Sequence, residues 1–509
     1  MADENGELRK TLQGDLRPFP VLHTPLAAPF LISHIPFLIP LMLPETFLQQ
    51  MRVLLGSEEA QRLCTVLTET EPPTSVRLNV RKLGASSSDL ISGMQDSAVA
   101  WCETGVYLKE RPMFTLDPVL HAGGYYVQEA ASMFIEQAYR KIARDFVPTA
   151  LLDLCAAPGG KSTLWRSLLP DGALLVANEP MRQRAEVLAE NLTKWGHPDV
   201  VVTNAFPAEF SALCGMFDVI ATDVPCSGEG MFRKDEGAVA EWSPANVITC
   251  ADRQWSILCD IWPCLRTGGY LVYSTCTYNR LENEEMVARI CKELGAEVVP
   301  LDVQSDWNVH TLDAPENLSE ASVQNNGMYH FFPHLTRGEG LFLCLMRKTA
   351  ETPEPRAKKE KKAKGGKPQV PAGASTVAKW ISDAEAYKIL STGDAELSAI
   401  RQSHADTAQR LMATLNCLKV GVTLAEEKGK KFAPAHDLAL ALNCNPDAFP
   451  TCELPLDDAL SYLRREAITI DAPRGYVIVT YKGLPLGFVN NLGNRANNMY
   501  PQQWRIRMK

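Results

Sequence analysis

Two cysteines stand where their thiols can act together on one substrate. Cys226 lies in the segment 219–230 and Cys276 in the segment 270–277, each directly after an apolar run. Apolar runs of this length that are rich in Val, Ile, Leu and Tyr are typical of buried strands. In an open parallel sheet, the residues just past the carboxyl ends of the strands border the ligand crevice. The sequence therefore predicts that both thiols reach one crevice, which indicates covalent chemistry.

A pyrimidine base is a substrate for which two thiols have separate uses. A thiolate that adds to C6 makes C5 a nucleophile able to take a methyl group, so one difficult step becomes two easier ones. The adduct must then lose its C5 proton, and a second thiol near C5 or C6 would help that elimination. Asp223, which precedes Cys226 by three residues, is expected to hydrogen-bond the N3/N4 edge of the base. Lys161 is expected to favour thiolate over thiol.

A glycine turn supplies a candidate cofactor site. The segment 151–162 runs from a strand through Gly159 and Gly160 into a helix that starts near Lys161. Glycine lets a ligand approach the backbone, and a helix N-terminus favours negative charge. Glu179 ends the next apolar run, nineteen residues past Gly160, where Rossmann-type sites place the acid that binds ribose hydroxyls. The loop therefore indicates a nucleoside-bearing cofactor.

The same loop has a competing interpretation as a triphosphate-binding loop. The sequence Gly160-Lys161-Ser162 matches the end of that motif, but its first glycine would fall at Cys155. Without that glycine, the turn that wraps backbone amides around a triphosphate is lost. A nucleotidase therefore remains the weaker alternative.

The elements that position these residues alternate along the chain. Within 146–349, apolar runs begin near residues 150, 173, 200, 217 and 270, with helical stretches between several of them, and another run covers 341–346. Such alternation predicts an α/β domain with a doubly wound, mostly parallel sheet and helices on both faces. Residues 42–145, with a strand-like segment at 75–80, form a predicted N-terminal α+β RNA-binding region.

The two ends of the chain differ from this domain in composition. Residues 18–44 are apolar but hold seven prolines, which break a membrane-spanning helix, so 1–41 is expected to be a disordered extension or a misplaced start. Residues 350–374 form a predicted flexible linker with seven Lys or Arg between 356 and 367. That linker is either a plain tether or a strap that contacts phosphates.

The last segment, 375–509, is expected to begin with helix and end as a small β-rich module. Its end mixes cations with aromatic rings in a pattern found on RNA-binding surfaces. The residues in question are Arg495, Tyr500, Trp504, Arg505 and Arg507.

Composition limits the classes of protein. A net charge of −9 argues against a uniformly basic nucleic-acid binder, although it permits basic patches. The 14 cysteines include no pair at C-x-x-C spacing, so no zinc or other metal site is predicted. Scattered cysteines fit a reducing compartment. We expect a soluble, cytoplasmic protein without a membrane anchor.

The three motifs together resemble a known family. The segments 155–161, 223–226 and 274–277 are similar to the motifs of the RNA 5-methylcytosine methyltransferases of the Nol/Nop/Sun family. The resemblance covers about residues 42–349. The segment 124–130 and the C-terminal end at 500–505 further resemble the bacterial small-subunit ribosomal RNA methyltransferase F group. The C-terminal module is accordingly expected to be PUA-like.

The resemblance implies a fold, a cofactor and roles for individual residues. It implies a class I methyltransferase fold that uses S-adenosylmethionine, with Cys276 as the nucleophile and Cys226 as the residue that aids product release. It implies that the cofactor is bound by Cys155, Ala156, Ala157, Pro158, Gly159, Gly160, Lys161, Glu179 and Asp223. Family members usually carry an acidic residue after the third strand, where this chain has Asn204, whose amide oxygen is assigned to the adenine amino group. Arg184 either pairs with Glu179 or lies free on the surface.

The leading hypothesis is an S-adenosylmethionine-dependent RNA cytosine-C5 methyltransferase that acts on 16S ribosomal RNA. Its expected partner is ribosomal RNA or the small ribosomal subunit, with no DNA partner, and a monomeric state is expected. A target base must be single-stranded or flipped out of its stack. Transfer RNA is the alternative substrate, and a non-catalytic RNA-binding ribosome assembly factor is the alternative function.

Overall fold

The computed structural model describes residues 42–84, 93–312, 327–352, 371, 373–393, 395–429 and 431–508. The predicted extension 1–41 and most of the predicted linker 350–374 lie outside the described residues. Among the described residues, no helix is both long enough and apolar enough to cross a membrane.

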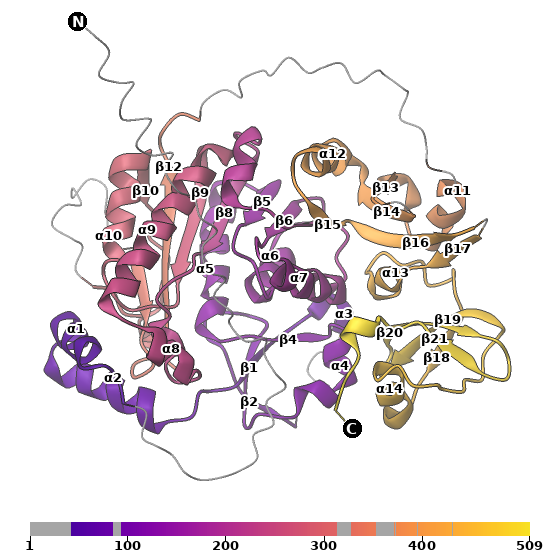
Figure 1. Cartoon of the computed structure of the whole chain (residues 1–509), viewed down its shortest axis with the longest axis horizontal. Helices are drawn as coiled ribbons and strands as arrows, with labels where there is room; N and C mark the ends of the chain where they lie inside the picture. The colour runs from indigo at the N-terminus through magenta and orange to yellow at the C-terminus, as the bar shows by residue number, and fades with distance from the viewer. Residues whose placement is uncertain are drawn as a thin grey trace, which may run out of the picture. The chain divides into compact units, whose positions relative to one another are not determined.

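A nine-stranded sheet positions the predicted site. Its strand order is β10-β12-β9-β8-β5-β6-β7-β15, with β11 paired to β12 (Figure 1). The five strands β5 to β9 are parallel, while β10, β11, β12 and β15 are antiparallel to their neighbours. The bounds are β5 Ala150–Asp153, β6 Leu174–Asn178, β7 Val200–Thr203, β8 Phe217–Asp223, β9 Leu265–Thr275, β10 Ala296–Val298, β11 Met328–Phe331, β12 Leu341–Lys348 and β15 Cys417–Val420.

Helices cover both faces of this sheet because side chains alternate along each strand. Leu152 of β5 belongs to the apolar cluster that includes Leu258 of α9, while Leu151 belongs to the cluster that includes Leu164 of α6. This two-sided burial confirms the predicted mostly parallel α/β architecture. The helices are α5 Ile135–Asp145, α6 Gly160–Leu168, α7 Arg182–Trp195, α8 Glu236–Glu241, α9 Pro244–Ile261, α10 Glu284–Arg289 and α12 Ala405–Thr414.

The N-terminal region forms a helical hairpin and a small sheet of order β2-β3-β1-β4. Arg77 of β1 is fully buried, donates to Gln128 Oε1 at 2.8 Å and donates to Thr163 Oγ1 of α6 at 2.6 Å. The small sheet therefore braces the helix that follows the glycine turn. The bounds are α1 Glu45–Leu55, α2 Ser57–Glu69, β1 Ser75–Leu78, α3 Val80–Leu83, β2 Gln95–Ala98, β3 Gly105–Leu108, α4 Pro118–His121 and β4 Tyr125–Val127.

The C-terminal segment holds two sheets, of order β13-β14-β16-β17 and β18-β19-β20-β21. It also contributes β15, which pairs antiparallel with β7 at the edge of the central sheet. The bounds are α11 Ala374–Val377, β13 Tyr387–Ser391, β14 Glu396–Arg401, β16 Val422–Lys428, β17 Lys431–Pro434, α13 His436–Leu440, β18 Thr451–Glu453, α14 Leu456–Leu463, β19 Gly475–Tyr481, β20 Leu484–Asn491 and β21 Ala496–Asn498.

Two details of this segment differ from the sequence-based expectation. After the short helix α11 the chain forms strands, because Leu397 and Ala399 face one apolar cluster while Ile400 faces another. Tyr500, expected on an RNA-binding surface, is 1% exposed and packs edge-on against Tyr462 at 5.4 Å. Arg495, Arg505 and Arg507 are exposed.

Candidate active site

The structure brings the two predicted cysteines into contact. Cys226 lies in the loop after β8 and Cys276 directly after β9, and these two strands are parallel neighbours. The two sulfur atoms are 3.2 Å apart, and both cysteines are free thiols that remain partly accessible. Adjacent parallel strands therefore deliver both thiols to one point, as the spacing of the apolar runs predicts.

The two thiols are not equivalent in their surroundings. The hydrogen bond with Cys276 and then burial raise the pKa of Cys226 well above its ordinary value, and the nearby carboxylates of Glu282 and Asp223 add to this effect. Cys226 therefore keeps its proton at neutral pH, and its sulfur is in hydrogen-bond contact with that of Cys276.

Asp223 and Lys161 form an ion pair beside the thiols. Lys161 Nζ lies 2.9 Å from Asp223 Oδ2, and Ser274 Oγ donates to Asp223 Oδ1 at 3.0 Å. Burial alone disfavours the ammonium, but the charge of Asp223 and its hydrogen bond raise the pKa of Lys161. Lys161 is consequently a permanent cation near the sulfur atoms, and Cys276 contributes to that raised pKa.

Glu229 ties the two cysteine-bearing loops together. Its fully buried carboxylate follows Cys226 by three residues and accepts hydrogen bonds from the backbone of Tyr278 at 2.7 Å and of Asn279 at 3.0 Å. Its other oxygen accepts from Trp242 Nε1 at 3.1 Å and from Gln50 Nε2 of α1 at 2.9 Å. The loop after β9 is therefore held in place by a carboxylate from the loop after β8.

Glu282, from the loop after β9, is bonded to the loop after β8. It lies after Cys276, is fully buried, and accepts from the backbone N–H of Ser227 at 3.0 Å, next to Cys226. Gln254 of α9 donates to Glu282 Oε2 at 2.7 Å and to the carbonyl of Pro225 at 3.0 Å. Burial raises the pKa of Glu282, although hydrogen bonds from Ser227 and Asn279 oppose the rise.

A close backbone contact fixes the main chain at Cys276. The N–H of Gly230 donates to the carbonyl of Cys276 at 2.8 Å, and a Cβ atom at residue 230 would lie 2.9 Å from that oxygen. Only glycine allows this approach, because real Cβ atoms do not come within 3.0 Å of a backbone oxygen.

Sequence reasoning missed Glu229, Gly230, Gln254 and Glu282. The available signal was proximity, since Glu229 and Gly230 follow Cys226 and Glu282 follows Cys276 within a few residues. Acidic residues in loops are usually solvated, so their full burial is visible only in the structure.

The glycine turn adopts the predicted strand–turn–helix arrangement. Gly159 has a left-handed φ of 116° and precedes α6, which starts at Gly160. Left-handed backbone favours glycine. The first N–H groups of α6 have no partner within the helix and are available to an anionic or polar ligand. Cys155, by contrast, is packed against Thr222, and burial raises the pKa of its thiol to about 12.

The side chains of this turn do not suit a triphosphate. Ser162 donates to Asp153 Oδ2 at 2.6 Å and is fully buried, so its hydroxyl does not face a ligand outside the turn. Lys161 is engaged by Asp223. Both side chains that a phosphate loop needs are therefore used within the protein.

Glu179 follows β6 at the same edge of the sheet. Its carboxylate accepts from the backbone N–H of Met181 at 2.9 Å and pairs with Arg184 at 3.5 Å. Arg184 also donates to the carbonyl of Ala157 at 3.2 Å, which connects Glu179 to the glycine turn. Burial raises the pKa of Glu179, against the effects of the Met181 amide and Arg184.

Asn204 lies after β7, and its side-chain orientation is defined. Its Nδ2 donates to the carbonyls of Glu179 at 2.9 Å and Pro180 at 2.8 Å. Its Oδ1 accepts from Asn416 at 3.4 Å, a residue next to β15. The amide oxygen is thus the atom left to accept a further donor, and a carbonyl oxygen has two lone pairs.

The donors and acceptors at this edge of the central sheet fit a cofactor that combines a nucleoside with an amino acid. The free N–H groups at the start of α6 suit an anionic group, the Glu179 carboxylate suits hydroxyls and the Asn204 oxygen suits an amino group.

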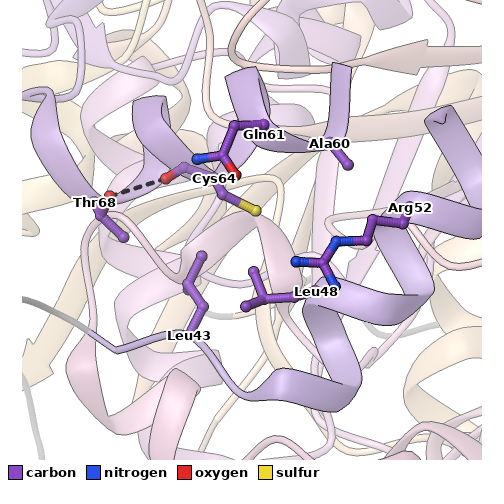
Figure 2. Close-up of a pocket in the computed structure, with 7 residues that line it drawn as sticks. All are labelled: Leu43, Leu48, Arg52, Ala60, Gln61, Cys64 and Thr68. Carbon is purple, nitrogen blue, oxygen red and sulfur yellow. Dashed lines mark hydrogen bonds between the residues drawn. The ribbon is translucent and has the colours of Figure 1, made fainter. Parts of the chain in front are cut away.

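A separate hollow of about 210 Å³ lies on the α1–α2 hairpin between Leu48, Arg52 and Cys64 (Figure 2). None of the residues predicted to act lines that hollow.

Three family models match successive parts of the chain. The model described as 16S rRNA methyltransferase RsmB/F matches residues 147–347. The model of the N-terminal domain of 16S rRNA methyltransferase RsmF matches residues 43–130, and that of the RsmF PUA domain matches 449–506. The last match covers the second of the two C-terminal sheets and confirms the predicted PUA-like module.

Relatives and solved structures agree with these matches. The chain is 31% identical to ribosomal RNA small subunit methyltransferase F of Klebsiella pneumoniae (strain 342), over 90% of this chain and 96% of that protein. It is 31% identical to the protein of the same name from Shewanella baltica (strain OS223), over 84% and 89% of the two chains. A crystal structure of a methyltransferase homolog protein from Pyrococcus horikoshii shares 26% identity, covers 60% of this chain and 96% of that one, and gives a TM-score of 0.50.

Proposed function

This chain belongs to the small-subunit ribosomal RNA methyltransferase F family, and on that premise we propose that it methylates C5 of a cytosine in 16S ribosomal RNA. The observation that carries the proposal is the 3.2 Å contact between Cys226 and Cys276 at the carboxyl ends of β8 and β9. Ribosomal RNA or the small subunit is the proposed partner.

S-adenosylmethionine is the proposed cofactor, and its sulfonium would supply the methyl group. Gly159, Gly160 and Lys161 would hold it at the start of α6, together with Glu179 and Asn204 on the next two loops. Cys155, Ala156, Ala157 and Pro158 complete the turn, and of these Ala156 is buried while Pro158 is exposed. Asp223 lies between this turn and the thiols, since it contacts Lys161 on one side and Ser274 on the other.

Cys276 is proposed to act as the nucleophile. Its thiolate forms a bond to C6 of the cytosine, and the electron pair of the C5–C6 double bond becomes available at C5 for methylation. Asp223 is proposed to hydrogen-bond the N3/N4 edge of the base and so to orient the ring, since a carboxylate can accept from the N4 amino group. Its oxygen atoms can accept more than the two hydrogen bonds that they receive from Lys161 and Ser274.

Cys226 is proposed to release the product. Cys226 Sγ lies 3.2 Å from Cys276 Sγ, so it stands beside the base once Cys276 has bonded to C6. Cys226 can then lose its proton to solvent, and its thiolate takes the proton from C5. The C6–S bond breaks, its electron pair returns to Cys276, and 5-methylcytosine leaves.

Bisulfite sequencing of ribosomal and transfer RNA tests the proposal. RNA from cells with and without the gene should differ at one or more 16S cytosines, and the wild-type gene should restore the signal while Cys276→Ala should not. A difference restricted to transfer RNA would assign a different substrate. No difference in either RNA, with purified protein that binds 16S RNA without methylating it, would identify an assembly factor.

A further inference from the structure

A groove of about 410 Å³ lies between the N-terminal sheet and the segment that follows Cys226. The chain entering β1, the turn after β3 and the end of β4 line the groove, and Lys234 and Arg337 complete its lining. None of the residues proposed to bind the cofactor or to form bonds with the base lines this groove.

Four cationic side chains face the groove, and two of them form no ion pair among the residues that the structure describes. Lys109 and Arg111, in the turn after β3, are exposed. In the part of the chain that the structure describes, neither takes part in an ion pair, and Arg111 only stacks over the ring of Phe114 at 5.4 Å. The hydrogen bond from Arg337 and, to a smaller extent, the charge of Lys109 lower the pKa of Asp96. Exposed cations outside an ion pair remain available to phosphate groups.

The other two cations are held in place by the protein. Arg337 pairs with Asp96 of β2 at 2.5 Å and stacks over the ring of Tyr107 at 4.3 Å. Lys234 lies 3.6 Å from the carboxylate of Glu339, whose nearer partner is Arg233 at 3.1 Å. These contacts hold the Arg337 and Lys234 side chains in place at the groove.

The groove is connected to the loop that carries the proposed nucleophile. The carbonyl of Glu339 accepts from the Tyr278 hydroxyl at 2.7 Å, two residues after Cys276. Lys234 follows Gly230, whose N–H bonds to the Cys276 carbonyl, within the same short segment. A strand of nucleic acid lying in the groove is thus adjacent to the loops that surround the thiols.

Three carboxylates also line the groove and limit its charge. Glu129 is engaged by three backbone N–H groups, of Ala131, Ser132 and Glu339, and burial raises its pKa. Glu71 and Glu110 are exposed. The groove therefore suits a few phosphates of a single strand near its cations better than a long duplex.

We infer that this groove binds phosphates of the RNA strand on one side of the target base, with Lys109 and Arg111 as direct contacts. The inference rests on the proposed function and adds the path that the substrate takes. Phosphate contacts position an RNA without reading its sequence, so their loss weakens binding uniformly and reduces its salt dependence.

Binding of a 16S RNA fragment by the full chain, measured at several salt concentrations, tests the inference. The double variant Lys109→Glu/Arg111→Glu should bind about 10- to 100-fold more weakly, with the slope of log affinity against log salt reduced by about 1 for each side chain. Glu110→Lys should change affinity in the opposite direction. The matched control is Lys292→Glu/Arg410→Glu, which reverses two exposed cations outside the groove lining.

The outcomes separate this inference from the proposed function. The groove variant could match the control in affinity and salt slope while the wild type methylates the RNA. In that case the groove does not bind the RNA, and the proposed methyltransferase function is still supported. If the wild type binds RNA through the groove without methylating it, the proposed methyltransferase function is rejected and RNA binding by the groove is supported. For methylation, the groove variant should raise KM and leave kcat and cofactor affinity unchanged, whereas misfolding would alter all three.

Discussion

The glycine turn after β5 and the cysteine loops after β8 and β9 lie at the same edge of one sheet, yet they are shaped in different ways. The turn takes its form from its own residues: Gly159 has a left-handed φ, and the helix starts one residue later. The cysteine loops take theirs from Glu229 and Glu282, each of which is bonded to the loop that carries the other cysteine.

The difference follows from what each loop must do. A cofactor site needs backbone groups, which a short local sequence can present. A pair of thiols from two strands needs a fixed distance between separate loops, and buried carboxylates with several donors can enforce it. We therefore expect substitutions in the cysteine loops to affect turnover and substitutions in the glycine turn to affect cofactor affinity.

The largest effect is expected for Cys276→Ala. Removing the nucleophile should lower methyl transfer to 16S RNA by at least about 10³-fold, since loss of a covalent catalyst removes the whole low-barrier route. S-adenosylmethionine affinity, measured by calorimetry, should stay within about twofold of wild type. Substantial methylation by this variant would remove the covalent mechanism. Cys344→Ala, which alters a fully buried cysteine of β12, is the control for stability effects.

Glu229→Gln should lower kcat by about 100-fold. The amide of glutamine places N–H groups next to the backbone and side-chain donors that Glu229 accepts from, so the loop after β9 shifts. A displacement near 1 Å at a reacting group has an effect of about this size. Cofactor affinity should be unchanged. Glu285→Gln, at an exposed position of α10, is the matched control. Equal kcat values for the two variants would show that Glu229 does not position the nucleophile.

Gly159→Ala should weaken cofactor binding about tenfold. Alanine at a φ of 116° is strained by about 1–2 kcal/mol, and its Cβ would lie 3.3 Å from Leu188. Gly172→Ala, at a φ of 85° in the turn before β6, imposes similar strain away from the site. Isothermal calorimetry with S-adenosylmethionine compares them. An equal loss of affinity in both variants would indicate general destabilisation, not a local effect on the turn.

The last expected effect is on the pH dependence of stability. Burial raises the pKa of Asp153 to about 7, despite the hydrogen bond from Ser162, while the unfolded value is about 3.9. Between these values the folded state binds a proton that the unfolded state does not, so stability should fall as pH rises from about 4 to 7 and level off above. Asp153→Asn should flatten this part of the profile in urea unfolding. An unchanged slope would contradict the raised pKa.

The sequence was sufficient for features that arise within one segment or one pair of neighbouring strands. Apolar runs of strand length predict β5 to β9 because each strand is buried on both faces, and parallel pairing of β8 with β9 then brings Cys226 and Cys276 together. The positions of the glycine turn, Glu179 and Asp223 are also predictable, because each comes at the carboxyl end of a predicted strand and so lies at the same edge of the sheet. The pairing of Arg184 with Glu179 was one of two open alternatives.

Features that depend on distant partners were beyond the sequence. Strand β15 joins β7 from more than 200 residues away, and four residues give no pattern that specifies this edge. Arg77 looks like an ordinary strand residue but is buried against α6. Glu229 and Glu282 look like solvated loop carboxylates, and Tyr500 looks like a surface aromatic, because burial is decided by the packing of separate segments.

The central claim is that Cys276 forms the bond to the base and Cys226 allows it to break. Cys226→Ala, incubated with 16S RNA and S-adenosylmethionine and then analysed on a denaturing gel, tests this claim most directly. We predict a protein–RNA adduct that survives denaturation in Cys226→Ala and is absent from Cys226→Ala/Cys276→Ala. No adduct in the single variant, or an adduct that persists in the double variant, would contradict the account.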